Sequence, residues 1–128
     1  MNSKRKYVEA NKILGDKYKI VIIDLCWCLY KDFGNGYDVE INIEGTLKNI
    51  KEIQVFLWKQ QPYQIVKTYY CDKIEEINDI VDKFYKDTQK YLTVAAEGRK
   101  EYAKKFKNAG ECMAYVLRSR VKHKCTIG

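Results

Sequence analysis

The sequence predicts one α+β domain with an N-terminal helix, a four-stranded antiparallel sheet made of two hairpins, and two or three C-terminal helices packed on one sheet face. Three observations carry this prediction. Apolar runs with strand periodicity are grouped in the first half of the chain, and short turn signals join them in pairs. Helix-period apolar patterns follow in the second half. The length of 128 residues suits a single core, so we treat 1–128 as one domain.

A short helix is expected at the start of the chain. Ser3 is a suitable N-cap, and Gly15 lies just past the expected end. Tyr7, Ala10 and Leu14 share one helix face and are predicted to be buried. The opposite side is basic, and we expect it in solvent: Lys4, Arg5, Lys6 and Lys12.

Two strands follow. The segment Val21–Leu29 is apolar on both faces apart from Asp24, which is typical of one strand in the middle of a sheet or under a helix. From Tyr37 to Glu44, apolar and polar residues alternate strictly, so the polar set is predicted to point outward. The intervening Gly34-Asn35-Gly36 is a hairpin signal.

The length of that hairpin loop sets the register. A two-residue turn would place Leu29 opposite Asn42 and so mix core with solvent. A three-residue loop pairs Leu29 with Ile41, and Trp27 with Ile43. Because a shift of one residue turns every side chain to the other face, we predict the three-residue loop.

A second hairpin is expected further along. Residues 46–52 are predicted to form a linker or one helical turn. The segments 53–59 and 63–71 then form two strands around Gln60-Gln61-Pro62. Both of their faces hold aromatic residues, so the alternation does not decide which face is buried.

The C-terminal half is predicted to be helical. Asp72 and Glu75 have the spacing of a capping box. An apolar stripe with helical spacing follows: Ile74, Ile77, Val81, Phe84, Thr88 and Tyr91. A further helix is expected over 95–107, with a break at 108–110 and a last segment to about Leu117. We take 93–121 as a basic helical part and 122–128 as a short mobile tail.

The charge of the chain is confined to its end. Residues 1–98 contain 15 basic and 15 acidic side chains, whereas residues 99–128 contain nine basic and two acidic ones. The last part therefore carries the whole formal net charge of +7. Such asymmetry favours a polyanionic or acidic partner. The predicted contacts are Arg99, Lys100, Lys104, Lys105, Lys107, Arg118, Arg120 and Lys122.

Aromatic residues form a second candidate contact set. The chain has 11 tyrosines and two tryptophans. Most are expected in the core and at the seams between helices and sheet. An aromatic sheet face can stack nucleic-acid bases, and aromatic side chains also anchor protein interfaces. The residues assigned to this set are Trp58, Phe56, Tyr70 and Tyr115.

Carboxylates on the second predicted strand form a third candidate. Asp38, Glu40 and Glu44 project together, and Asp24 and Asp32 lie beside them in the chosen register. Such groups hold Mg²⁺ or perform acid–base chemistry, but the same spacing is typical of an exposed sheet face, which we favour. No catalytic residue is assigned, and a small enzyme ranks third among the predicted functions.

Five cysteines are predicted to be free thiols in a reducing compartment. Cys26-x-Cys28 and His123-x-Cys125 together offer four ligands for zinc, but both spacings are tighter than zinc pairs usually have. We therefore predict no metal and no cofactor. No apolar run reaches the roughly 18 residues that cross a bilayer, and no signal-peptide core follows the basic start. These patterns predict a cytoplasmic protein that does not contact the membrane.

The leading functional prediction is a non-catalytic protein that docks on nucleic acid or a nucleoprotein complex through its basic C-terminal helices. The alternative is a protein-binding inhibitor or adaptor, which uses the sheet aromatics or places the basic helices on an acidic protein surface. The small size, the isolated α+β design and the lack of a catalytic set resemble accessory proteins of mobile elements, including phage anti-defence (anti-CRISPR-like) inhibitors.

Overall fold

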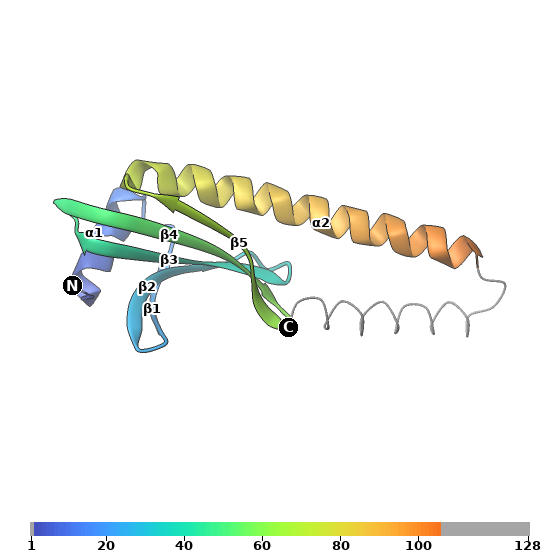
Figure 1. Cartoon of the computed structure of the whole chain (residues 1–128), viewed down its shortest axis with the longest axis horizontal. Helices are drawn as coiled ribbons and strands as arrows, with labels where there is room; N and C mark the ends of the chain where they lie inside the picture. The colour runs from blue at the N-terminus through green and yellow to red at the C-terminus, as the bar shows by residue number, and fades with distance from the viewer. Residues whose placement is uncertain (1, 106–128) are drawn as a thin grey trace. The chain divides into compact units, whose positions relative to one another are not determined.

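The structure is a computed structural model that describes residues 2–105. It confirms an α+β fold with an N-terminal helix and an antiparallel sheet (Figure 1). The sheet has five strands rather than four, in the order β1-β2-β3-β4-β5. The elements are α1 (Lys4–Ile13), β1 (Lys19–Ile23), β2 (Cys26–Asp32), β3 (Tyr37–Thr46), β4 (Asn49–Gln60), β5 (Tyr63–Cys71), the 3₁₀ turn η1 (Ile74–Glu76) and α2 (Ile77–Lys105).

The chain divides after Lys86 into two compact units. The first holds α1, the sheet and the beginning of α2. The described part of the second is the remainder of α2, which continues as one helix to Lys105. The prediction of a separate helix from residue 95 is therefore wrong for the described residues: Thr93 is β-branched, but its hydroxyl donates to the Gln89 carbonyl at 2.9 Å within the helix. The predicted break at 108–110 lies outside the described residues.

The fifth strand arises from a turn inside the segment predicted to be one strand. Asp24 and Leu25 have φ angles of 51° and 66°, and the strands on either side pair through Ile23 with Cys26. Two consecutive left-handed residues form the two-residue turn that joins twisted antiparallel strands. The favoured sequence for this turn is Asn-Gly. Leu25 occupies the position that glycine usually takes in this turn. Because leucine is apolar, the apolar run of the sequence continues through the turn and gives no sign of it.

The three-residue hairpin loop is confirmed. Leu29 pairs with Ile41, and the Phe33 N–H donates to the Tyr37 carbonyl at 3.0 Å across the loop. The pairing of β2 with β3 ends at Leu29, so the predicted pair of Trp27 with Ile43 does not form. Trp27 pairs instead with Ile22 of β1.

Helix α1 occupies the place that β2 leaves beside β3. The Ile43 N–H donates to the Tyr7 hydroxyl at 3.0 Å. The Lys6 ammonium donates to the carbonyls of Ile43 (2.7 Å) and Gly45 (3.0 Å). Lys6 is 8% exposed, so its predicted position in solvent is wrong. Its charge is buried because polar backbone groups at the edge of β3 need donors once β2 has turned away.

The other features of α1 follow the prediction. The Ser3 hydroxyl accepts from the Lys6 N–H at 3.3 Å as an N-cap. Tyr7, Ala10 and Leu14 are buried, and Gly15 follows with a φ of 86°.

The predicted linker over 46–52 is instead part of a hairpin. Strands β3 and β4 continue to Thr46 and from Asn49, with a register shift at Gly45. Gly45 has a φ of 90°, and the Asn49 N–H donates to the Thr46 hydroxyl at 3.1 Å. The register shift breaks the alternation of apolar and polar residues here, so the sequence pattern did not indicate that the two strands extend to Thr46 and from Asn49. The second predicted hairpin is confirmed, with β4 and β5 joined at Gln61-Pro62.

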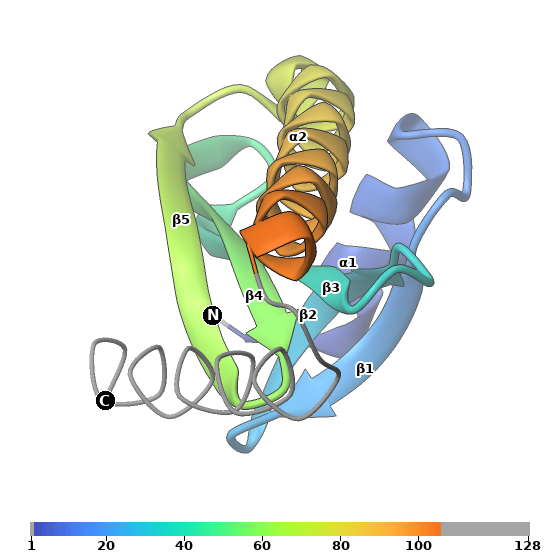
Figure 2. The ribbon, with the colours of Figure 1, turned by 90° about the vertical axis from the view of Figure 1, so that its right-hand side faces the viewer.

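One face of the sheet forms the core with α2. Strands β3 and β4 contribute the buried residues Val39, Ile41, Ile43, Ile53, Val55 and Leu57. The beginning of α2 lies along this face (Figure 2), and its predicted stripe is buried at Ile77, Val81 and Phe84. The capping box is not formed, because Lys73 occupies the N-cap without a side-chain hydrogen bond. Asn78 connects α2 to the end of α1 by donating to the Leu14 carbonyl at 3.1 Å.

Candidate binding face on the sheet

The face of the sheet opposite α2 carries aromatic and acidic side chains. The strand register places Asp38 opposite Trp58, Glu40 opposite Phe56, and Gln54 opposite Tyr70. Phe56 and Trp58 are half-buried, and Tyr70 is 59% exposed. We call this surface the open sheet face, and it comprises Tyr30, Asp38, Glu40, Asn42, Glu44, Glu52, Gln54, Phe56, Trp58, Thr68 and Tyr70.

A buried carboxylate lies at one end of the open sheet face. Asp38 was predicted to point into solvent, but it is 1% exposed. Its Oδ2 accepts from the hydroxyls of Tyr30 (2.7 Å) and Tyr63 (2.8 Å) and from the Gln60 amide (3.2 Å). Four strands, β2 to β5, thus converge on one oxygen atom. We call these four residues the Asp38 cluster.

The Asp38 cluster keeps its phenols neutral. Burial, followed by the hydrogen bond to Asp38, raises the pKa of Tyr30 far above its usual value. The hydrogen bond to Asp38 is the main cause that raises the pKa of Tyr63, with burial second. A carboxylate accepts hydrogen bonds and cannot donate them, so three donors suit it. The cluster is satisfied internally, and the predicted alternative of a Mg²⁺-binding carboxylate does not fit Asp38.

Further hydrogen bonds hold the rest of the open sheet face. Glu40 accepts from the Trp58 indole at 3.2 Å and from the Asn42 amide at 2.8 Å. Glu52 accepts from the Gln54 amide at 2.8 Å. The Trp58 and Tyr63 rings meet edge to face, with centroids 5.9 Å apart. Trp58, Glu40 and Glu52 are therefore held in place before any partner arrives, whereas Tyr70 and Glu44 are exposed beside them.

The structure brings together some of the predicted site residues. Phe56, Trp58 and Tyr70 share the open sheet face, as the aromatic hypothesis requires. Asp32 lies opposite Asp38, but Asp24 is in the β1–β2 turn. Among the described residues, no three histidine, cysteine, aspartate or glutamate side chains are grouped as metal ligands would be.

The basic set is described only in part. Arg99 is exposed on α2, and Lys100, Lys104 and Lys105 belong to the same helix. The other predicted residues lie outside the described part of the chain: Lys107, Arg118, Arg120, Lys122, Tyr115, His123 and Cys125.

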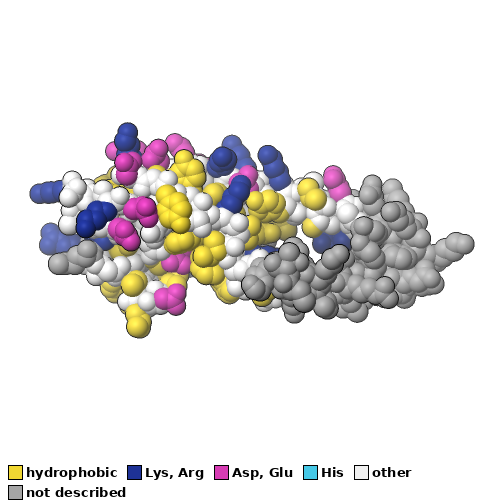
Figure 3. Space-filling view, in the orientation of Figure 1, with side chains coloured by type: hydrophobic (Ala, Val, Ile, Leu, Met, Phe, Trp, Pro, Cys, Tyr) yellow, Lys and Arg dark blue, Asp and Glu magenta, His cyan; other side chains and the backbone are white. Residues whose placement is uncertain are grey.

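Exposed apolar side chains concentrate on β5. Ile65 is 47% exposed, Val66 37% and Tyr69 46%. Figure 3 shows hydrophobic side chains gathered over this strand, beside lysines and carboxylates at the beginning of α2. Sequence reasoning missed this surface, because neither face of β5 could be recognised as the buried one.

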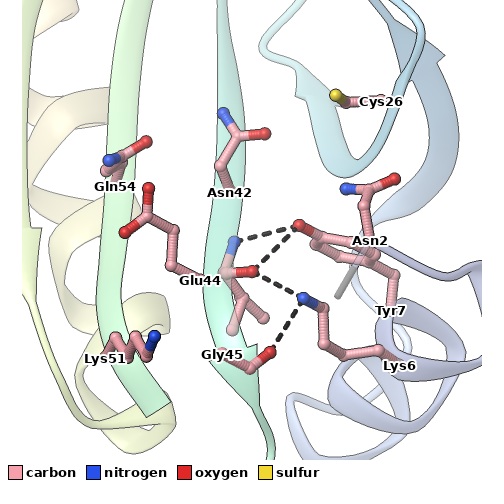
Figure 4. Close-up of a pocket in the computed structure, with 10 residues that line it drawn as sticks. Asn2, Lys6, Tyr7, Cys26, Asn42, Glu44, Gly45, Lys51 and Gln54 are labelled. Atoms are coloured by element: carbon pink, nitrogen blue, oxygen red, sulfur yellow. Dashed lines mark hydrogen bonds between the residues drawn. The ribbon is translucent and has the colours of Figure 1, made fainter.

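A polar hollow of about 430 Å³ lies between α1 and the ends of β3 and β4 (Figure 4). Lys6 and Glu44 line this hollow. Burial lowers the pKa of Lys6, and the negative charge of Glu44 raises it in part. The side-chain amide of Asn2 donates to the Trp27 carbonyl at 3.0 Å and accepts from the Trp27 N–H at 2.7 Å. Lys6 and Tyr7 use their polar groups to join α1 to β3, so this wall of the hollow is structural, and the opposite wall includes Asn42, Glu44 and Gln54 of the open sheet face.

The thiols provide a first test of the fold. Cys28 is fully buried, and burial is the main cause that raises its pKa to about 12, whereas Cys26 is exposed. Since the thiolate is the nucleophile, Cys28 stays unreactive from pH 8 to 10 while the chain is folded. We expect iodoacetamide to modify Cys26 and to spare Cys28 until denaturant is added, as fragment-ion mass spectrometry would show. Equal modification of both thiols in the folded chain would contradict the burial of Cys28.

The β1–β2 turn provides a second test. Leu25 is 97% exposed and adopts a φ of 66°. A left-handed conformation costs a non-glycine residue about 1–2 kcal/mol, and an exposed leucine regains little of this by packing. Leu25→Gly is therefore expected to raise the free energy of unfolding by about 1 kcal/mol in urea titrations, the gain being reduced by the chain entropy of glycine. A loss of stability would show that the turn has another conformation.

Comparison of the chain with protein-family models, with curated proteins and with solved structures gives no match. Functional inference therefore depends on the residues themselves. Within the described part of the chain, no helix has the length and apolar character needed to cross a membrane.

Proposed function

We propose that this protein is a non-catalytic binding module, an adaptor or inhibitor, that uses the open sheet face to bind a basic region of another protein. The observation that carries the proposal is the gathering of aromatic rings and carboxylates on one accessible sheet face, held by hydrogen bonds. Tyr70 is exposed, and Trp58 is fixed to Glu40.

The chemistry of this face suits arginine and lysine. Aromatic side chains anchor protein interfaces, and guanidinium groups stack on aromatic rings while pairing with carboxylates. Glu44 and Tyr70 are exposed on this face on β3 and β5, with β4 between them. A basic segment that crosses β4 can therefore pair one side chain with the carboxylate and stack another on the ring. Because Glu40 and Trp58 are already ordered, binding loses less conformational entropy than it would with mobile side chains.

The proposal is tested by affinity capture from a lysate of the organism that encodes the chain, with and without nuclease. We expect a protein partner that remains after nuclease treatment and is lost with Tyr70→Ala or Glu44→Lys. Asp82→Lys is the matched control, since Asp82 is exposed on the beginning of α2, which packs on the other face of the sheet. A partner retained equally by all variants, or no partner at all, would refute the proposal.

A second candidate is docking on nucleic acid or a nucleoprotein complex through the basic C-terminal residues. The confinement of the +7 net charge to residues 99–128 favours it. The open sheet face does not suit phosphate, because Glu40, Glu44 and Glu52 repel it. Contact with about five phosphates would give a log–log salt slope near −4.5 for duplex DNA. Absence of a shift in low-salt gel assays would eliminate this candidate.

A further inference from the structure

Strand β5 is a long exposed edge. Among the described residues, no strand pairs with its outer side. The strand has nine residues and contains no proline, since Pro62 lies just before its start. Edge strands present backbone donors and acceptors to which another chain can add. Natural edges are commonly protected by charges or kept short, but β5 carries Lys67 as its single charged residue. The other edge, β1, has only five residues.

A groove runs beside this edge. It has a volume of about 340 Å³, and its walls come from β5 and from the beginning of α2. Tyr69 of β5 is 46% exposed there, and Ile80 and Phe84 of α2 form the apolar floor. An exposed strand next to an apolar groove is the arrangement by which domains bind extended peptides: the edge supplies main-chain hydrogen bonds and the groove accepts side chains.

The charges on the rim differ between the two ends of the groove. Glu76 and Asp79 lie towards the end where β5 passes into α2. Lys67 and Lys83 lie further from that turn, one on each wall. Glu76 and Lys83 are seven residues apart, about 10 Å along the helix axis, and Lys67 lies four residues, about 13 Å, before the end of β5 at Cys71. Asp79 lies between these ends, one helical turn from Lys83. A peptide in the groove thus meets carboxylates first and amines second.

We propose that the β5–α2 groove binds an extended peptide segment of a protein partner as a sixth, antiparallel strand. An antiparallel addition continues the pairing of the whole sheet and places the amino end of the peptide next to Glu76 and Asp79. Side chains on one face of a strand are two residues apart. The ligand therefore has a basic residue, an apolar residue two positions later, and an acidic residue two positions after that. The inference builds on the proposed protein-binding function but uses a different surface.

The test selects linear ten-residue peptides from a random display library on the immobilised full chain. We expect the selected peptides to share the basic, apolar, acidic order. Asp79→Lys is expected to weaken a selected peptide by about tenfold or more in titration calorimetry. Asp82→Lys is the matched control: it makes the same charge change on an exposed residue of the same helix, outside the groove, and leaves affinity within about twofold. Peptide binding should also slow amide hydrogen exchange along β5.

Several results would overturn the proposal. These are the selection of no peptide, equal affinity for the Asp79→Lys and Asp82→Lys variants, and amide exchange in β5 that the peptide leaves unchanged. Self-association through β5 in analytical ultracentrifugation would identify a second copy as the occupant and overturn it as well. Glu44→Lys leaves the peptide affinity intact, because Glu44 lies on the open sheet face. If Tyr70→Ala or Glu44→Lys abolishes capture of the partner but no peptide binds the β5–α2 groove, the proposed function stands and the groove proposal fails.

Discussion

Asp38→Ala is expected to lower the free energy of unfolding by about 2–4 kcal/mol, because three donors lose their common acceptor inside the sheet. The Tyr30 hydroxyl and the Gln60 amide now donate to Asp38, and in the variant both donors would lose this acceptor. The effect is measured by urea titration followed by circular dichroism.

The control for this variant is Glu44→Ala. Glu44 is an exposed carboxylate on the same strand that also favours the charge of Lys6, and its removal is expected to cost under about 1 kcal/mol. Tyr30→Phe removes a single donor and should cost about 1 kcal/mol. Equal stability of the Asp38→Ala and Glu44→Ala variants would show that the Asp38 cluster does not hold the four strands together.

The second large effect is expected at Gly45. A Cβ at this position would lie 2.5 Å from the Asn49 carbonyl oxygen and 3.0 Å from the Lys51 nitrogen, and the φ of 90° is strained for any side chain. Gly45→Ala should therefore lower the free energy of unfolding by about 3 kcal/mol or more, because backbone atoms in a hairpin cannot move aside as a flexible side chain does.

Gly34→Ala separates the two causes. Gly34 also has a positive φ, of 73°, but its Cβ would meet nothing within 4 Å. That variant is expected to lose only about 1 kcal/mol, the cost of the left-handed backbone. If both alanine variants were equally stable in the same urea titration, the close approach at the β3–β4 bulge would be wrong.

Local patterns predicted much of the sheet. The register of Leu29 with Ile41 followed from the requirement that apolar residues share one face, and the second hairpin followed from turn residues between apolar runs. The β1–β2 turn escaped notice, because Leu25 gives a turn position the appearance of a strand. A two-residue turn can thus be hidden wherever an apolar side chain accepts a left-handed backbone.

The candidate site was less predictable, since it depends on contacts between distant residues. Alternation correctly placed Asp38 on the face opposite Ile41, but burial on that face comes from Tyr30 and Tyr63, which belong to other strands. Lys6 was assigned to solvent by helical periodicity. Its burial results from the divergence of β2 from β3, and no local pattern encodes that divergence.

Site-specific photo-crosslinking tests the central claim most directly. The benzophenone amino acid p-benzoylphenylalanine is placed at Tyr70, which is 59% exposed on the open sheet face, or at Ile13, which is 61% exposed on α1. After nuclease treatment of the lysate and irradiation, we predict a protein adduct from position 70 and none from position 13. An adduct that forms equally from both positions, or one that disappears with nuclease, would contradict the assignment of the open sheet face as a protein-binding surface.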